Sequence, residues 1–468
     1  MRLHFLGASR NVTGSCYLLE ADDIRVIIDC GLYQERKYQD RNWQPFPFSP
    51  ETIDAVFLTH AHLDHCGLLP KLVRDGFKGR IYCTQATAEI AQIILLDAAH
   101  LQEEDAAYKA KRHQREGRRG PHPELPLYTV EDAEAVAPYF TAVEYDSCVR
   151  IKDGIEGCFY EAGHVLGSAT VAINTVQDDK KQRILFSGDI GEPDRPIIND
   201  PAIFNAADYI VVESTYGDRT HAEHKITDIQ SQLRDCINET VQAGGNIIVP
   251  SFALERSQEI LYHLNELFLR NEIPPITVFL DSPMAIRITE VFKHHAELFD
   301  TEMTRRLRQG NSPFSFDNLK MVQTTEESKA INSLKGSAII IAGSGMVSGG
   351  RIKHHLVNNI THPGSTVLFV GYQAEGTPGR KLLDGAKRIR LLGRTHRVRA
   401  RVVKIDGFSA HADRDGLLAW LSDIRIPPRY VFITHGEKKA AISFAQFLGE
   451  KTGWKTSVPE YGADVLLE

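Results

Sequence analysis

The amino-acid sequence predicts an α/β fold, because strand-like and helix-like patterns alternate along almost the whole chain. Short runs of apolar and β-branched residues, typical of buried strands, occur at 25–29, 55–59, 183–186, 209–212, 246–250, 277–280, 338–342, 366–370, 399–405 and 430–434. Helical spacing of apolar residues follows several of these runs, at 254–269, 414–421 and 438–448. Such alternation is typical of sheets covered by helices.

Length and composition agree with a folded protein of more than one domain. The chain has 468 residues, and a typical domain has ~150. Apolar residues make up 42% and charged residues 25%, with 35 Gly and 21 Pro, which excludes disordered, collagen-like and coiled-coil chains. The formal net charge is −7, from 54 basic and 61 acidic residues. This acidity argues against broad, non-specific binding to nucleic acid.

The first residues and the cysteines predict a cytoplasmic protein without a membrane segment. Residues 1–7 contain few apolar side chains before Gly and Ser follow, which predicts a first strand rather than a signal peptide. No run approaches the ~18 apolar residues that cross a bilayer. The seven cysteines are scattered and form no Cys-x-x-Cys pair. We therefore expect neither a disulfide framework nor a thiolate zinc site.

A dense set of metal-ligand side chains follows the strand predicted at 55–59. His60, His62, Asp64 and His65 place three imidazoles and a carboxylate within six residues. Nitrogen and oxygen donors of these types suit zinc. A single histidine is usually a core or surface residue, but this spacing predicts a metal site.

Four polar residues near the ends of other predicted strands are candidates for further ligands. They are Asp29, His164, Asp189 and His435. Alone, each is explained equally well as a turn residue or a helix cap. Loops at the carboxyl ends of strands, however, are where α/β folds build their sites. His435 also ends a Phe-Ile-Thr-His segment that is similar to the Phe-Leu-Thr-His segment ending at His60.

The order of these residues resembles the metallo-β-lactamase superfamily, whose motifs run from Asp29 through the 60–65 cluster and His164 to Asp189. Later segments resemble the additional motifs of the β-CASP nucleases, a branch that includes RNase J and the endonuclease subunit of the cleavage and polyadenylation specificity factor. These segments are Val-Glu-Ser-Thr-Tyr-Gly at 212–217, Gly-Phe-Ser-Ala-His-Ala-Asp at 407–413 and Thr-His-Gly-Glu at 434–437. Similar supporting segments lie at 250–256, 281–285 and 343–351. The resemblance covers essentially the whole chain.

The resemblance implies a four-layer αβ/βα metallo-β-lactamase fold with an inserted α/β β-CASP domain. The first domain would comprise residues 1–207 and 388–468, and the inserted domain residues 208–387. Two zinc ions are implied as cofactors. The implied ligands are His60, His62 and His164 for one ion, Asp64, His65 and His435 for the other, and Asp189 between them. Asp29 is expected behind the ligands, where it would orient a histidine or the loop backbone.

The implied chemistry is phosphodiester hydrolysis by a hydroxide that two metals activate. Asp64 and Asp189 are expected to act in catalysis as well as in metal binding. No metal needs to reach the leaving oxygen, so an acid on the far side is useful. We expect His411 to be this acid and Glu213 to hold its ring protonated through a hydrogen bond. The simpler alternative for His411 is a residue at the start of a helix.

Contacts to phosphate are expected from small residues and from basic segments. By resemblance, Ser344, Gly345 and Ser348 in a glycine-rich loop, together with Ser409, bind phosphate, although a plain turn explains any single glycine as well. The run 109–119 carries six basic residues and one acidic residue. It either follows an RNA backbone or forms a solvated helix face and loop. A second set of basic residues comprises Arg394, Arg397, Arg399 and Arg401.

Single-stranded RNA is the expected substrate and partner. Within the family, a histidine at the third additional motif, here His435, is typical of the RNA-directed branch. Cleavage would be endonucleolytic, 5′-to-3′ exonucleolytic, or both. The alternatives are a metallo-hydrolase of small esters, thioesters or lactams, and a catalytically silent β-CASP scaffold subunit. We expect no membrane partner, and a homodimer stays open.

Overall fold

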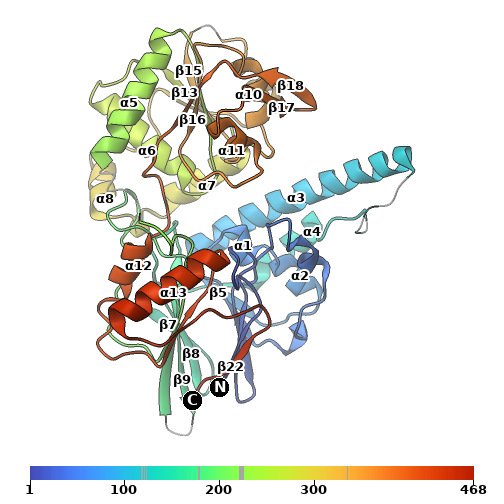
Figure 1. The fold of residues 1–468 in the computed structure, drawn as a ribbon, viewed down its shortest axis with the longest axis vertical. Helices are drawn as coiled ribbons and strands as arrows, with labels where there is room; N and C mark the ends of the chain where they lie inside the picture. The colour runs from blue at the N-terminus through green and yellow to red at the C-terminus, as the bar shows by residue number, and fades with distance from the viewer. Residues whose placement is uncertain (118–119, 121, 123, 178–179, 221–225, 335) are drawn as a thin grey trace. The chain divides into compact units, whose positions relative to one another are not determined.

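The computed structural model confirms the α/β class and divides the chain into two compact units (Figure 1). It describes all residues except 118–119, 121, 123, 178–179, 221–225 and 335. Unit 1 comprises Met1–Asp194, Asn199–Thr220 and His411–Glu468, and unit 2 comprises Arg195–Ile198 and His221–Ala410. No helix among the described residues is both long and apolar enough to cross a membrane.

Unit 1 contains two seven-stranded sheets. Along the first sheet the strands are β22 (Asp464–Leu466), β1 (Arg2–Phe5), β2 (Tyr17–Ala21), β3 (Ile24–Ile28), β4 (Ala55–Phe57), β5 (Arg80–Cys83) and β6 (Phe140–Ala142). Along the second they are β21 (Thr456–Ser457), β20 (Tyr430–Ile433), β11 (Tyr209–Val212), β10 (Lys180–Phe186), β9 (Ala169–Gln177), β8 (Ile155–Glu161) and β7 (Ser147–Lys152). Parallel pairing joins β3, β4 and β5 in one sheet and β10, β11 and β20 in the other.

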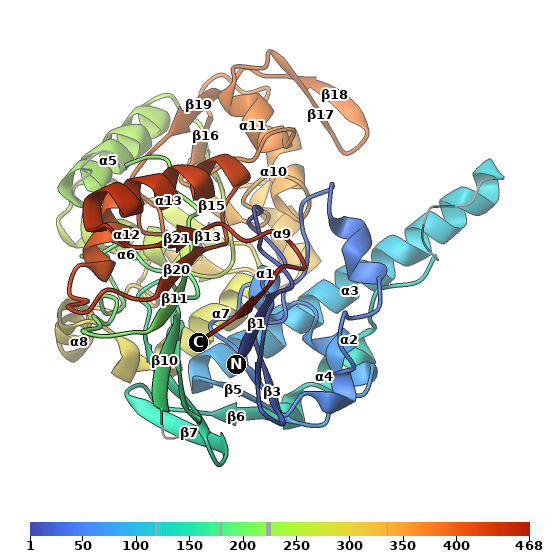
Figure 2. The ribbon, with the colours of Figure 1, turned by 60° about the horizontal axis from the view of Figure 1, so that its bottom comes forward.

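The two sheets pack face to face, and helices cover their outer faces. Phe5 and Phe57 of the first sheet share one core with Phe159 and Phe186 of the second. The helices of this unit are α1 (Leu63–Cys66), α2 (Leu69–Arg74), α3 (Gln85–Glu116), α4 (Val130–Glu134), α12 (Arg414–Leu421) and α13 (Lys438–Thr452). Figure 2 shows α2, α3 and α4 on the side of the first sheet, and α12 and α13 pack on the second through a separate core cluster. Unit 1 is therefore a four-layer αβ/βα sandwich, as predicted.

Unit 2 is built on a six-stranded, all-parallel sheet. Its strands, in spatial order, are β14 (Leu319–Met321), β13 (Thr277–Leu280), β15 (Ala338–Ala342), β12 (Ile247–Pro250), β16 (Thr366–Phe369) and β19 (Arg401–Lys404). Its helices are α5 (Ile226–Gln242), α6 (Arg256–Leu269), α7 (Pro283–His294), α8 (Thr301–Arg308), α9 (Thr325–Ile331), α10 (Ile352–Asn359) and α11 (Pro378–Leu383). A separate hairpin is formed by β17 (Arg388–Leu391) and β18 (Arg394–Arg397). Short 3₁₀ turns complete the chain: η1 (Gln39–Trp43), η2 (Pro50–Thr52) and η3 (Ala137–Tyr139) in unit 1, and η4 (Ala296–Leu298) in unit 2.

The bounds of the compact units differ from the three segments expected from the sequence. Strand β11 pairs with β10 and β20 and so lies in unit 1, while the β17–β18 hairpin lies in unit 2. The division into 1–207, 208–387 and 388–468 stays a prediction.

One disulfide corrects the expectation for the cysteines. Cys148 and Cys158 stand directly opposite each other in the antiparallel β7–β8 pair and are bonded. They lie ten residues apart in the sequence, and only the register of the two strands brings them together. The other five cysteines are free and buried.

Gly157 of one sheet of unit 1 lies close to Phe57 of the other, and this contact predicts a stability difference. A Cβ atom added at Gly157 of β8 would lie 2.1 Å from Cε1 of Phe57 in β4. Gly157→Ala should therefore lower the free energy of unfolding of unit 1 by about 1–3 kcal/mol through overpacking. Unit 1 contains all three tryptophans, Trp43, Trp420 and Trp454. Their fluorescence in a guanidinium titration therefore reports the unfolding of this unit.

Gly449→Ala is the matched control. Gly449 lies inside α13, and an added Cβ would be 3.7 Å from the nearest atom, the carbonyl oxygen of Trp454. Replacement by alanine should raise the unfolding free energy by up to about 1 kcal/mol through helix propensity. Equal effects of the two substitutions would contradict the close sheet contact.

Candidate metal centre

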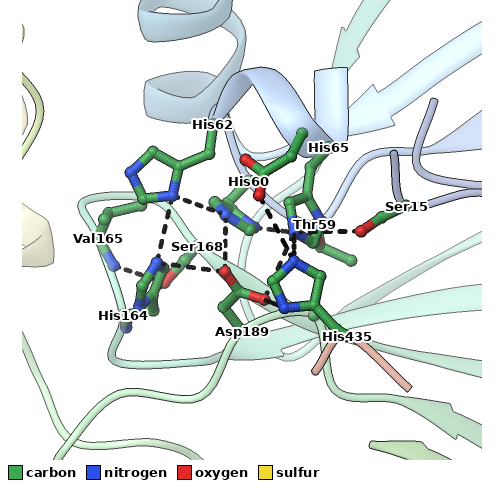
Figure 3. A network of polar contacts seen from close by, with 12 residues as sticks. Ser15, Thr59, His60, His62, His65, His164, Val165, Ser168, Asp189 and His435 are labelled. Atoms are coloured by element: carbon green, nitrogen blue, oxygen red, sulfur yellow. Dashed lines mark hydrogen bonds and ion pairs between the residues drawn. The ribbon is translucent and has the colours of Figure 1, made fainter. Parts of the chain in front are cut away.

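The polar residues singled out in the first 220 and the last 40 residues of the sequence meet at the carboxyl ends of strands in both sheets of unit 1. Asp29 follows β3, and the 60–65 cluster follows β4 and runs into α1. His164 lies in the loop between β8 and β9, and Asp189 follows β10. His435 follows β20. Figure 3 shows the histidine rings of this group gathered around the carboxylate of Asp189.

Asp29 lies behind the ring of histidines and determines how two of them are oriented. Its Oδ2 accepts a hydrogen bond from Nδ1 of His65 at 2.7 Å and from the hydroxyl of Thr59 at 2.9 Å, while Oδ1 accepts from the Thr59 amide at 2.8 Å. Because the Thr59 hydroxyl donates to Asp29, it accepts from Nδ1–H of His60, 3.1 Å away. In their neutral forms both imidazoles therefore carry their proton on Nδ1 and have a lone pair on Nε2.

The two carboxylate oxygens of Asp189 face different histidines. Oδ2 lies 3.5 Å from Nε2 of both His60 and His164. Oδ1 lies 3.4 Å from Nε2 of His65 and 3.4 Å from Nδ1 of His435. Asp189 is thus placed between two groups of donors. Burial opposes its ionisation, but the imidazoles of His435 and His65 hold its pKa well below the ordinary value.

The donor atoms form two sets with the spacing of metal sites. His60, His62, His164 and Asp189 offer ligand atoms within 4.8 Å of one another, and so do Asp64, His65 and His435. Nδ1 of His62 lies 3.0 Å from Nε2 of His60 and 3.3 Å from Nε2 of His164. Zinc–nitrogen bonds of about 2.0–2.1 Å would place tetrahedral nitrogens about 3.3–3.4 Å apart. The spacing within the first set is close to that value.

Burial and charge also fit a cation at this place. Burial holds the pKa of His60 well below its usual value and lowers that of His62 to about 4, so both rings are neutral donors at pH 7. Within the described residues, the buried Oδ1 of Asp189 accepts no hydrogen bond. Burial opposes a charge on His65, but the carboxylates of Asp189 and Asp29 raise its pKa well above the usual value. The buried carboxylates thus favour a positive charge within the cluster. The donor residues around Asp189 therefore fit a metal cation.

His411 lies beside this cluster and is held by Glu213. Nδ1 of His411 is 3.1 Å from Oε1 of Glu213, which also accepts a hydrogen bond from the Ile190 amide at 2.7 Å. The side chain of His411 is 21% exposed, whereas the Glu213 side chain is fully buried. Burial opposes protonation of the ring, but the carboxylate of Glu213 raises the pKa of His411 to about 9. His411 is therefore protonated at neutral pH and reaches solvent.

The loops that carry these residues approach each other very closely. Asp29 and His435 both adopt positive φ, at 59° and 45°, a conformation that costs free energy in residues other than glycine. A Cβ at Gly31 would collide with the carbonyl of Asp64, and a Cβ at Gly191 with that of Gly163. Glycine at these two positions lets neighbouring ligand loops touch.

Several site residues were not predicted from the sequence. Thr59 links Asp29 to His60, and the Thr215 hydroxyl lies 3.2 Å from Nδ1 of His435. The Ser168 hydroxyl accepts a hydrogen bond from the His164 amide at 3.1 Å. The Thr-His pair that follows both similar strand segments, at 59–60 and 434–435, could have indicated Thr59 as a site residue. Hydroxyl residues that contact ligands through tertiary packing leave no comparable pattern.

The expected phosphate-binding residues lie in unit 2. Ser344, Gly345 and Ser348 belong to the loop between β15 and α10, and Ser409 precedes the return of the chain to unit 1. The loop closes on itself, since the Ser344 hydroxyl lies 3.1 Å from that of Ser348 and accepts from the Gly349 amide at 3.1 Å. Their role in phosphate binding stays a prediction.

Residues 109–116 of the basic run form the end of the long helix α3, and residues 118–119 lie outside the described part of the chain. Lys109 forms an ion pair with Asp105 at 2.5 Å, and Arg112 pairs with Glu116 at 2.8 Å. Two of its positive charges are thus compensated within the helix, which favours the solvated helix face over the RNA contact.

Comparison with protein families agrees with the order of the motifs. The model of the metallo-beta-lactamase superfamily matches residues 10–215, and that of the Beta-Casp domain matches residues 257–382. The model of the Zn-dependent metallo-hydrolase RNA specificity domain matches residues 395–459. A crystal structure of a protein of unknown function from Enterococcus faecalis V583 has a TM-score of 0.56 at 13% identity, over 100% of this chain and 99% of that chain, and shows likeness of fold alone.

Curated relatives match the chain over nearly its whole length. It is 36% identical to Ribonuclease TTHA0252 of Thermus thermophilus, over 99% of this chain and 100% of the relative. It is 31% identical to an RNase J-like protein of Methanocaldococcus jannaschii, over 98% of each protein. Transcription termination factor FttA of Methanosarcina mazei is 31% identical over 96% of this chain and 69% of that protein. Together with the metal-ligand geometry, these matches show that the chain belongs to the β-CASP family of the metallo-β-lactamase superfamily.

Proposed function

We propose that this chain is a zinc-dependent ribonuclease that hydrolyses phosphodiester bonds of single-stranded RNA, as an endonuclease, a 5′-to-3′ exonuclease, or both. The observation that carries the proposal is the arrangement around Asp189. Two sets of donors flank its carboxylate, and the protonated His411 lies beside them. The relatives named ribonuclease and RNase J-like protein support RNA as the substrate.

We assign two zinc ions to the cluster as cofactors. His60, His62 and His164 would hold one ion, Asp64, His65 and His435 would hold the other, and Asp189 lies between the two sets. Asp29 keeps the Nε2 atoms of His60 and His65 free for these bonds. Zinc bound here would supply a hydroxide near neutral pH and neutralise charge on the phosphoryl oxygens.

His411 acts on the leaving oxygen of the cleaved bond. Its ring is partly exposed and protonated, so it can donate a proton as negative charge develops on that oxygen. Glu213 fixes the ring through Nδ1, which leaves Nε2 to carry the donated proton. Because the backbone of His411 also pairs with Gly191 in an isolated β-bridge, its ring is held close to Asp189.

The remaining assignments concern the substrate and the setting of the enzyme. We assign phosphate contacts to Ser344, Gly345, Ser348 and Ser409. The oligomeric state stays open between a monomer and a homodimer. We assign a cytoplasmic location from the RNA substrate; the cysteines do not decide it, since five are free and Cys148 and Cys158 are bonded.

A cleavage assay with three substrates tests the reaction. The zinc-loaded protein is incubated with 5′-end-labelled single-stranded RNA, with DNA of the same sequence and with a nitrophenyl ester. RNA alone should be cut, and laddered or single-nucleotide products distinguish the endonuclease from the exonuclease. His62→Ala, purified in parallel, controls for contaminating ribonucleases. Cleavage of the ester alone would support the small-molecule hydrolase, and no cleavage of any substrate would support the silent scaffold.

Replacement of His411 tests its role as the acid. His411→Ala should retain the zinc content of the wild type, because the ring is outside both donor sets, but lose about 10²–10⁴-fold in the turnover number. Zinc is measured by atomic emission and turnover on the labelled RNA. Wild-type turnover in this variant would contradict the assignment, and loss of zinc would make His411 a structural residue of the centre.

Replacement of Asp29 tests its role in orienting the ligands. Asp29→Asn keeps the size of the side chain but removes the charge that accepts from Thr59 and His65. Zinc affinity, measured by competition with a chromogenic chelator, should fall by about 10–100-fold. Thr59→Ser, which retains the hydroxyl, should bind zinc like the wild type. Unchanged affinity in Asp29→Asn would show that the metal bonds alone orient the histidines.

A further inference from the structure

The β17–β18 hairpin of unit 2 carries an unusual concentration of positive charge. Between Asp384 and Asp406 the chain contains eight Lys and Arg residues and no Asp or Glu. This stretch contrasts with the net charge of −7 for the whole chain. Figures 1 and 2 both show the hairpin projecting from its unit beside α11.

The register of the hairpin separates an apolar inner face from a basic outer face. Ile389 and Leu391 are buried in the core cluster of unit 2. Arg388 and Arg390 alternate with them and are exposed. Across the ladder, Arg388 stands opposite Arg397, and Arg390 opposite Thr395. A two-residue turn at Leu392 and Gly393, both with positive φ, joins the strands and fixes this pairing.

The positive charges of the outer face are not compensated by nearby carboxylates. Among the described residues, no ion pair joins Arg388, Arg390 or Arg397 to a carboxylate. The basic side chains just beyond the hairpin are compensated, because Arg401 forms an ion pair with Glu239 and Lys404 forms one with Asp406. Like charges directly opposite each other in a ladder are destabilising. An external anion would relieve the repulsion between Arg388 and Arg397.

Helix α3 provides an internal comparison. It is the other basic segment of the chain, but Lys109 and Arg112 form ion pairs with carboxylates one helical turn away. Among the described residues, the hairpin therefore offers guanidinium groups without ion pairs, whereas two basic side chains of α3 are compensated. Guanidinium groups bind phosphate with two parallel hydrogen bonds.

We propose that the outer face of the hairpin, formed by Arg388, Arg390 and Arg397, binds the phosphate backbone of single-stranded RNA. The inference rests on the proposed ribonuclease function and adds a substrate contact in unit 2. Protein interfaces have an apolar centre, and membrane-bound surfaces insert apolar side chains. The strands of the outer face carry arginine and threonine and no apolar side chain, and the exposed Leu392 lies at the turn. Phosphate chains are bound by charge alone and without regard to sequence.

The salt dependence of RNA binding tests the proposal. All proteins carry His411→Ala to prevent cleavage, and binding to a fluorescein-labelled 20-nucleotide RNA is followed by anisotropy between 50 and 300 mM KCl. The triple variant Arg388→Gln, Arg390→Gln, Arg397→Gln should bind at least tenfold more weakly at 100 mM. The plot of the logarithm of the association constant against the logarithm of the salt concentration should become less steep by about 2. Each phosphate contact on a single strand contributes about 0.7 to the steepness of this plot. An unchanged affinity and slope would overturn the proposal.

Matched variants separate a contact at the hairpin from a general loss of positive charge. Lys109→Gln, Arg112→Gln, Arg115→Gln removes the same number of charges from α3 and should leave the slope unchanged; an equal loss in this variant would overturn the assignment to the hairpin. Replacing the three hairpin arginines by lysine should restore most of the slope, and failure of this rescue would also count against a phosphate contact. If unlabelled oligoglutamate displaces the labelled RNA as effectively as unlabelled RNA does, the outer face binds acidic proteins instead, and the proposal is overturned.

A small substrate distinguishes failure of this inference from failure of the proposed function. With His411 intact, the glutamine triple variant should hydrolyse bis(p-nitrophenyl) phosphate at the wild-type rate, because that substrate has no extended backbone. Loss of this activity would mean a damaged centre and overturn the contact role. A wild type that binds RNA with the expected slope but does not cut it would refute the ribonuclease and leave the hairpin contact in place. A wild type that binds no RNA would refute the hairpin contact.

Discussion

A single buried carboxylate, that of Asp29, orients two of the five histidines of the cluster, His60 and His65. It holds Nδ1 of His65 directly and Nδ1 of His60 through Thr59. A neutral imidazole has one lone pair, so fixing the proton on Nδ1 determines that Nε2 faces Asp189. Asp29 can do this because it stands where β3 ends, next to the end of β4 in the same sheet. The chemistry of the centre thus depends on the parallel pairing of two strands.

The centre also needs a rigid frame, because its ligands come from both sheets. His60 and His65 follow the first sheet, while Asp189 and His435 follow the second. Phe57, two residues before Thr59, lies in the core shared by the two sheets. Side-chain packing between the sheets therefore keeps the donor sets at their spacing. It also sustains the positive φ angles of Asp29 and His435, which neither residue favours alone.

Local patterns predicted most of the elements and the ligand cluster, but not the contacts that depend on register and packing. The strands at 209–212, 277–280 and 338–342 have the predicted bounds. The 60–65 cluster was recognisable because its residues are close in the sequence. The Cys148–Cys158 bond was missed, because two cysteines ten residues apart meet only when the hairpin register is known. Thr59 and Thr215 were missed for a similar reason, since a hydroxyl becomes a site residue only through its neighbours in space.

Net charge is a poor guide to partners when opposite charges are segregated on the surface. The acidic total of −7 includes buried carboxylates such as Asp29, Asp189 and Glu213, which act on imidazoles inside the protein and contribute little to the field at the surface. The same total hides the difference between the two basic segments. On α3 two of the basic residues, Lys109 and Arg112, pair with carboxylates of the same helix, whereas on the β17–β18 hairpin the cross-strand register places Arg388 opposite Arg397. Because electrostatic attraction in salt acts over about 10 Å, the uncompensated face decides what binds there, and the average over the chain does not.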